Sequence, residues 1–176
     1  MSQTSVTDAP IGVPGDIADL NTARNGQRSS AKSEEASATI PFGVMVKRGT
    51  GDYGVLKCTA VANVLAGVTV RSHDFAVGLG VDETTGGLKP GAHFAVAQRG
   101  RYFVVIEEDV TPTSDVRVRC VAAGNEVAGA FRATADSTDC VDLTPLARWV
   151  RTADADDGVA ELEIDMNNIG LAVADT

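Results

Sequence analysis

Residues 39–47, Thr-Ile-Pro-Phe-Gly-Val-Met-Val-Lys, place an apolar side chain at every second position from Ile40 to Val46. Successive side chains of a β-strand point to opposite faces of a sheet, so this spacing is typical of a strand with one buried face. The stretch before it is polar and contains only isolated apolar residues. We therefore predict that a β-rich body begins at Thr39 and covers residues 39–176.

Further strands are indicated downstream of this stretch. Apolar runs at residues 55–59 and 66–70 follow a turn cluster, and residues 93–98 and 101–107 alternate on either side of Arg99-Gly100. Glycine supplies the positive φ that a two-residue turn requires. The last two of these runs are therefore predicted to form a β-hairpin with its turn at Gly100.

The end of the sequence has the clearest alternation. Residues 147–152 and 159–166 flank an acidic turn at residues 153–158, and in the second run the apolar side chains again occupy every second position. Those apolar residues are Ala160, Leu162, Ile164 and Met166. The pattern predicts a strand pair with one buried and one charged face.

Short strands separated by turns, with no alternation of strands and helices, are typical of an all-β protein. We predict a small antiparallel β-barrel or β-sandwich with an extended N-terminal arm. Helix content should be low, because eighteen glycines punctuate the chain and no long amphipathic helix is indicated.

The predicted arm comprises residues 1–38. This segment is rich in Ser, Thr, Asn, Gln, Ala and Asp, and has too few apolar residues to build a core of its own. The segment Pro10-Ile11-Gly12-Val13-Pro14-Gly15 favours extended or turn geometry, because proline restricts the residue before it and glycine disfavours helix.

The formal net charge of −9 argues against nucleic-acid binding, which depends mainly on Lys and Arg neutralising phosphates. The expected partner is another protein. Three cysteines without CxxC spacing indicate neither a disulfide framework nor a zinc site, and a reducing compartment is expected. The first residues lack the features of a signal peptide, and no apolar run is long enough for a membrane helix, so no membrane partner is predicted.

No motif predicts catalysis. The two histidines, His73 and His93, lie twenty residues apart, and neither is near a serine elbow because GxSxG is absent. Asp154, Asp156 and Asp157 superficially resemble a calcium loop, but the following glycine falls one position early, which favours a solvated hairpin turn. The sequence thus predicts no enzyme, no catalytic residue, no cofactor and no metal site, while binding of an ion at the acidic turn stays open.

The order of these features resembles the head decoration or capsid cement proteins of tailed phages. The resemblance rests on segments spread over most of the chain, which are residues 12–16, 38–49, 67–70, 88–91 and 147–164. It implies a small β-barrel or sandwich that binds the outer surface of the capsid and stabilises it by bridging capsomers. The alternative is another β-rich virion component, such as a tail-tube, head-completion or fibre-associated protein.

The resemblance also implies the partners and the place of assembly. These are the major capsid protein and further copies of the chain itself, as a dimer or a trimer, in a virion assembled in the host cytoplasm. An arm that orders on binding can cover a large surface and join several subunits. The capsid-binding candidates in the arm are Pro10, Ile11, Gly12, Val13, Pro14, Gly15, Ile17 and Leu20.

Overall fold

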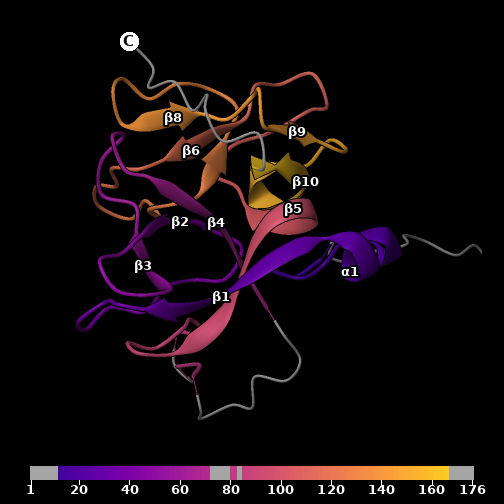
Figure 1. Ribbon diagram of the computed structural model, residues 1–176. Coiled ribbons are helices and arrows are strands. Elements are labelled where there is room, and N and C mark those ends of the chain that lie inside the picture. The colour runs from indigo at the N-terminus through magenta and orange to yellow at the C-terminus, as the bar shows by residue number, and fades with distance from the viewer. Residues whose placement is uncertain (1–11, 72–79, 83–84, 167–176) are drawn as a thin grey trace, which may run out of the picture.

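The structure is a computed structural model that describes residues 12–71, 80–82 and 85–166. Among the described residues, the regular secondary structure is mainly strand, together with a six-residue helix and one 3-10 turn (Figure 1). The elements in chain order are α1 (Leu20–Asn25), β1 (Gln27–Ser33), β2 (Met45–Arg48), β3 (Gly54–Lys57), β4 (Leu65–Val70), β5 (His93–Val105), β6 (Arg117–Arg119), β7 (Phe131–Arg132), β8 (Cys140–Asp142), β9 (Ala147–Trp149), η1 (Ala155–Asp157) and β10 (Val159–Asp165). None of the described helices is long and apolar enough to span a membrane.

The strands form two sheets. The larger has the order β1-β3-β2-β4-β5-β10-β9, and β1 also pairs with β5, so that β1, β3, β2, β4 and β5 close a ring (Figure 1). The smaller sheet has the order β7-β6-β8. The predicted all-β class with a small barrel is confirmed, although the pairing of β1 with β3 is parallel.

The ring encloses the first of two hydrophobic cores. It contains Ala31, Ile40, Phe42, Val44, Val46, Val55, Ala66, Leu88, Ala92, Phe94 and Val96. The apolar face predicted for residues 39–47 is therefore confirmed. The strand is shorter than predicted, however, since β2 begins at Met45, after Gly43 adopts a φ of +72°.

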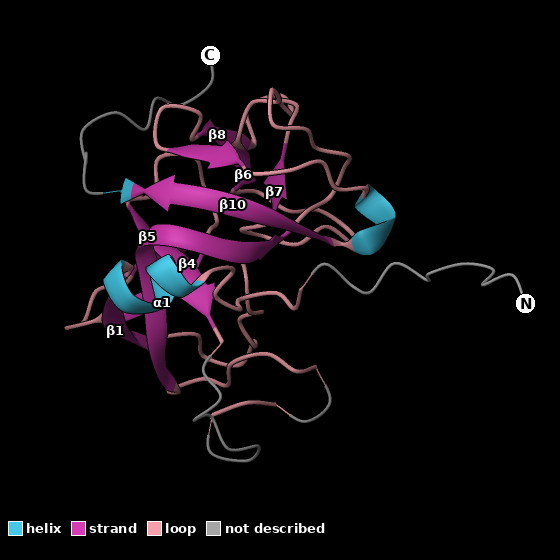
Figure 2. Cartoon of the chain, turned by 90° about the vertical axis from the view of Figure 1, so that its right-hand side faces the viewer, coloured by secondary structure: helices cyan, strands magenta, loops and turns pink. Residues whose placement is uncertain are grey.

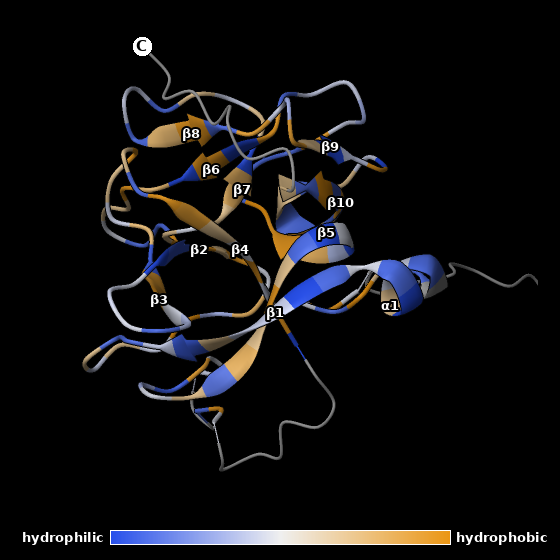
Figure 3. Ribbon diagram, in the orientation of Figure 1, coloured by the Kyte–Doolittle hydropathy of each residue, from blue (hydrophilic) through white to orange (hydrophobic). Residues whose placement is uncertain are grey.

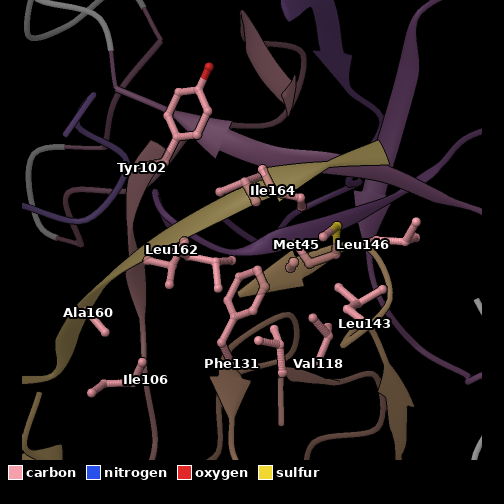
Figure 4. Packing of buried hydrophobic residues seen from close by; sticks show 14 of the residues in the cluster. Met45, Tyr102, Ile106, Val118, Phe131, Leu143, Leu146, Ala160, Leu162 and Ile164 are labelled. Atoms are coloured by element: carbon pink, nitrogen blue, oxygen red, sulfur yellow. The ribbon is translucent and has the colours of Figure 1, made fainter. Parts of the chain in front are cut away.

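The second core lies between the small sheet and the face of the large sheet outside the ring. Its members include Met45, Val68, Val70, Tyr102, Val104, Val118, Phe131, Val141, Leu143, Trp149, Leu162 and Ile164. Figure 4 shows Phe131 of β7 pointing toward Leu162 and Ile164 of β10. The buried face predicted for the last strand is confirmed, because Ala160, Leu162 and Ile164 are at most 1% exposed.

The strand β5 belongs to both cores because it changes face along its length. Phe94 and Val96 lie in the ring core, whereas Tyr102 and Val104, also at even positions, lie in the second core. A regular strand would keep all four on one side. The change falls between Ala97 and Gly100: the β1–β5 register skips Gln98, and Gly100 has a φ of +129°. This is the geometry of a β-bulge, which bends a strand and redirects its side chains.

The hairpin predicted at Arg99-Gly100 is therefore wrong. Glycine with positive φ suits a tight turn and a bend within a strand equally well, and here the chain continues through Gly100 as one bent 13-residue strand. The continuation is stabilised by neighbours on both halves, with β1 paired to His93–Arg99 and β10 paired to Arg99–Val105.

We predict that Gly100→Ala destabilises the protein by about 2–3 kcal/mol, because the new side chain would adopt an unfavourable φ and meet the Thr22 side chain. An ideal Cβ at Gly100 lies 2.5 Å from Thr22 Cγ2, whereas one at Gly124, with a φ of +60°, meets nothing within 4 Å. Gly124→Ala is the matched control and should cost about 1 kcal/mol in urea unfolding. Equal losses for the two variants would contradict the role assigned to Gly100.

Candidate functional site

The N-terminal segment predicted as an arm is packed on the body from Gly12 onward. Gly15 N–H donates to the Phe103 carbonyl oxygen at 2.7 Å, Phe103 N–H donates to the Asp16 carbonyl at 3.0 Å, and Ala18 N–H donates to the Arg101 carbonyl at 3.0 Å. Ile17 also forms an antiparallel bridge with Tyr102. Residues 15–18 thus make a short antiparallel ladder with the C-terminal half of β5.

The strand β1 continues this ladder along the N-terminal half of β5. Its pairs run from Gln27 opposite Arg99 to Lys32 opposite His93, also antiparallel. Residues 15–33 therefore follow β5 over most of its length, interrupted only by α1, which lies beside the kink at Gly100. Figure 2 shows α1 against β5 and β1. The division predicted at residue 38 falls after β1, which is an integral strand of the sheet.

Thr22 connects α1 to β5 beside the bend at Gly100. Its Oγ1 accepts a hydrogen bond from Arg101 N–H at 2.7 Å, and the residue is 3% exposed. Asp19 caps the helix by accepting from Thr22 N–H at 2.5 Å. This backbone hydrogen bond lowers the pKa of the Asp19 carboxyl below its usual value. A short helix with one capped end is marginal alone, so its position depends on these contacts.

Close backbone approach holds the start of the ladder. Gly15 has a φ of +86°, and its carbonyl accepts from Arg71 N–H at 2.8 Å. A Cβ at Gly15 would lie 2.9 Å from both Arg71 N and Phe42 Cβ, and one at Gly43 would lie 2.8 Å from Gly15 N. These glycines allow three backbone segments to meet where any larger residue would separate them.

The structure places the eight predicted docking residues in three environments. Pro10 and Ile11 lie outside the described residues. Gly12, Pro14, Gly15 and Ile17 are partly or fully covered by the body, and Leu20 is the first residue of α1. Val13 is 41% exposed, so its apolar side chain reaches the surface. The sequence did not single out Thr22 or Asp19, although Asp three residues before Thr22 is a capping signal.

The described arginines differ sharply in their surroundings. Beyond residue 100, all six form ion pairs with nearby carboxylates, namely Arg101, Arg117, Arg119, Arg132, Arg148 and Arg151. Within the described part of the chain, Arg24 and Arg48 form no ion pair, and Arg28 donates to the Ala23 carbonyl. The surface around β1 thus carries cationic side chains without acidic partners in the described residues.

Arg119 of β6 is the most buried of the six, with a side chain 5% exposed. It contacts Glu107 at 2.7 Å, Asp136 at 2.8 Å and Glu126 at 3.0 Å. Burial alone would lower the pKa of Arg119, but the hydrogen bonds with Glu107 and Asp136 raise it overall. The network joins the loops around the small sheet, and it satisfies charges that would otherwise be costly to bury.

The groups that could carry chemistry are dispersed. The cysteines Cys58, Cys120 and Cys140 are buried and unpaired by disulfides, and burial raises the pKa of the Cys140 thiol. The described residues contain no cluster of acidic, His or Cys side chains that could hold a metal ion. The acidic turn contains η1 and ends at Gly158, where Ala155 N–H donates to Asp109 at 2.7 Å. His73 lies outside the described residues, and His93 is exposed on β5.

Comparison with known proteins decides the family. A family model described as structural cement protein (E217 gp24/Pam3 gp6) matches residues 2–165. The chain belongs to this phage structural cement protein family. The family is structural rather than enzymatic, so the predicted resemblance is confirmed and the cement protein is a component of the phage capsid.

A solved structure is similar to this cement protein in fold. It is a chain of the structure titled "The capsid of Myoviridae Phage XM1", with a TM-score of 0.65, 16% sequence identity, and coverage of 94% of this chain and 97% of that chain. No curated protein matches. This likeness concerns the fold, and the family assignment selects the capsid over the tail-tube, head-completion and fibre-associated alternatives considered from the sequence.

We predict that Thr22→Val loosens residues 12–26 and lowers the free energy of unfolding by about 1–2 kcal/mol, because the Arg101 amide loses its acceptor. Limited proteolysis and urea unfolding measure the two effects. Asn21→Ala, which removes an exposed side chain of the same helix, is the control and should change both by little. Equal protease resistance of Thr22→Val and the parent protein would contradict this role.

The Arg119 network predicts a dependence of stability on pH. The hydrogen bond with Arg119 lowers the pKa of the Asp136 carboxyl below its usual value. Carboxylates with lowered pKa stabilise the fold above their unfolded pKa of about 4, and this contribution is lost as pH falls through the folded pKa. Urea unfolding should therefore show stability decreasing below about pH 4.5.

Arg119→Met tests the origin of that decrease. It should cost about 2–3 kcal/mol at pH 7, less than for a fully buried pair, because its partners are partly solvated. It should also make the acid-side decrease in stability shallower than in the parent protein. An unchanged slope below pH 4.5 would show that other carboxylates cause it.

Proposed function

We propose that this cement protein binds the outer surface of the capsid as a homo-oligomer and stabilises the shell by bridging capsomers of the major capsid protein. Many weak contacts, repeated over a symmetric shell, act multivalently and can hold neighbouring capsomers together. A dimer or a trimer would suit different symmetry positions of the shell. The membership of a cement family supports the capsid as the partner.

We propose that the contact with the major capsid protein is made by the N-terminal segment up to Val13, with Pro10 and Ile11 in the part before the anchor. The supporting observation is the abrupt change at this point. Gly15 is buried and bonded to Phe103 and Arg71, whereas Val13, two residues earlier, exposes 41% of its apolar surface. Fixing the backbone of one residue costs about 1–2 kcal/mol of conformational entropy. A docking segment that starts at a rigid anchor has fewer residues left to fix on binding than a free arm, so its binding costs less entropy.

The remaining predicted docking residues have a different part in this proposal. Gly12, Pro14, Gly15, Ile17 and Leu20 fix the direction in which the docking segment leaves the body. They do not contact the capsid themselves in this proposal; they orient Val13 and the residues before it, which do. Substitutions at Gly15 should therefore weaken capsid binding only as far as they loosen the ladder with β5.

The test is binding of purified protein to expanded capsids that lack it, measured by co-sedimentation over a range of concentrations. Val13→Asp and deletion of residues 2–11 should each weaken binding at least about tenfold, because a buried contact is lost at every repeated site. Val121→Asp is the matched control, since Val121 is also an exposed valine, at 38%, but follows β6.

Binding of Val13→Asp and the deletion variant with the affinity of the parent protein would overturn the proposed docking segment. Absence of parent-protein binding to expanded capsids would overturn the proposed cement function itself. Immunogold labelling of the virion provides the location, and label inside the shell only would contradict binding to the outer surface.

A further inference from the structure

Two of the three buried cysteines lie side by side in the second core. Cys58 follows β3 and Cys120 follows β6, and the two thiols are within hydrogen-bonding range of each other. Both side chains are at most 2% exposed and belong to the same cluster of buried residues. The two residues are far apart in the sequence, so only the fold brings them together. This cysteine pair therefore arises from tertiary packing and leaves no CxxC spacing in the sequence.

Backbone hydrogen bonds fix the segments that carry the cysteine pair. Cys58 Sγ donates to the Met45 carbonyl at 3.6 Å, and Met45 N–H donates to the Gly129 carbonyl at 2.8 Å. Gly129 N–H in turn donates to the carbonyl of Arg119, the residue before Cys120, at 2.8 Å. Figure 3 shows β6 and β8 of the small sheet above β2 and β4 of the ring, with hydrophobic colours in β4 and β8. The pair thus lies where the small sheet meets the ring, and Met45 connects the two parts.

The third cysteine has a different environment. Cys140 of β8 lies opposite Arg119 of β6, and opposite residues of paired strands share one face of a sheet. Arg119 belongs to the ion-pair network, whereas Cys120, the next residue, enters the second core. Neighbouring residues along a strand face opposite sides. Cys140 is therefore a buried thiol of the same sheet that provides a matched control for the pair.

The surroundings of the pair favour a thiolate at Cys120. A hydrogen bond from the Cys58 thiol lowers the pKa of Cys120, burial opposes this effect, and the Lys47 ammonium supports it. Lys47 Nζ donates to Thr59 Oγ1 at 2.6 Å, which holds the ammonium beside the residue that follows Cys58. The thiolate is the nucleophilic form of cysteine. Cys120 is therefore the attacking sulfur in an oxidation of the pair, and Cys58 is the sulfur that resolves it.

An exposed loop gives a small oxidant access to the pair. Cys58 begins the loop of residues 58–64, in which Thr59, Ala62 and Val64 are exposed. Val64 exposes 65% of its surface. Loops open locally at a lower free energy than paired strands. A molecule as small as hydrogen peroxide can thus reach the two buried sulfurs during such an opening.

We propose that Cys58 and Cys120 are a redox modification site, which forms an intramolecular disulfide when the virion leaves the reducing host cytoplasm. The oxidant is hydrogen peroxide. The Cys120 thiolate attacks one peroxide oxygen, the O–O bond breaks, hydroxide leaves, and Cys120 becomes a sulfenic acid. The Cys58 thiol then attacks the Cys120 sulfur, the S–O bond breaks, and water leaves. Hydroxide takes up the proton first lost from Cys120, so two thiols and one peroxide give one disulfide and two waters.

The disulfide would stabilise the protein after assembly of the virion. Virion surfaces are among the oxidising environments in which disulfides persist. A cross-link between residues 58 and 120 closes a long loop and restricts the unfolded chain, an effect that grows with loop length. The bond also connects the ring to the small sheet, while the surface around Val13 is unchanged. Formation of the disulfide is therefore independent of the docking segment, and the purified full chain is sufficient to test it.

The first test maps the disulfide in the parent protein, purified under dithiothreitol and then treated in its native state with a small excess of hydrogen peroxide. The three thiols should fall to one, and dithiothreitol should restore them. Trypsin cleaves after Lys and Arg, so the three cysteines fall in separate peptides, which are residues 58–71, 120–132 and 133–148. Mass spectrometry should find the first two peptides joined at least about tenfold more often than any other pair, because their thiols are already in contact.

The second test measures the thermal midpoint of each protein with and without the oxidant. The midpoint of the parent protein should rise by at least about 5 °C on oxidation, because the cross-link restricts the unfolded chain. Cys140→Ala should show the same rise, whereas Cys58→Ala and Cys120→Ala should show none. If one of these two variants does not fold, the other variant and the peptide map of the parent protein decide.

Several results would overturn the proposal. Cross-links that mainly contain the peptide 133–148 would mean a different pair, and covalent dimers on a non-reducing gel would mean that the bond forms between chains. Three thiols that persist in the native protein, under conditions that oxidise the urea-unfolded chain, would mean that the pair is inaccessible. An equal rise of the midpoint in the parent protein and Cys58→Ala, or a disulfide without any rise, would contradict the stabilising role.

Discussion

The pairing of residues 15–33 along β5 is the interaction on which the rest of the structure depends. The ladder with Arg101 and Phe103 and the pairing of β1 with His93–Arg99 together hold the two halves of one bent strand. The same pairing closes the ring, because β1 connects β5 to β3. Without it the ring core would have an open side, and β5 would lose its partner on both sides of the bulge at Gln98.

The bend in turn divides the hydrophobic core. Side chains before Gly100 enter the ring, and those after it face the small sheet, so one strand carries two cores without a break in its hydrogen bonding. This arrangement leaves two features at the surface. One is the exit of the N-terminal segment at Val13, and the other is the open edge of β1. In the proposed function, the first of these features makes the contact with the capsid.

The sequence predicted correctly the strands that bury one face, because burial of one face places an apolar residue at every second position. Ala160, Leu162 and Ile164 alternate with charged residues and are buried as expected, and Ile40 to Val46 line the ring core. It failed at β1 because Gln27–Ser30 are exposed on both faces and are recruited through backbone pairing alone, which leaves no apolar pattern. The hairpin at Gly100 was wrong for a similar reason, since only long-range neighbours decide between a turn and a bulge. The composition of the N-terminal segment also could not show that Val13 is exposed while Gly15, two residues later, is buried against the body.

Native-state hydrogen exchange of the full chain tests the central claim most directly. If residues 15–18 and β1 form one ladder with β5, the amides of Gly15, Ala18 and Phe103 should be protected to nearly the same free energy as those of the β5–β10 pairing, since opening either part exposes the same strand. Thr22→Val should reduce the protection of Gly15 and Ala18 before that of β10. Exchange of Gly15 and Ala18 at the rate of an unstructured chain, with β5 still protected, would contradict the account and restore a free arm that ends at residue 38.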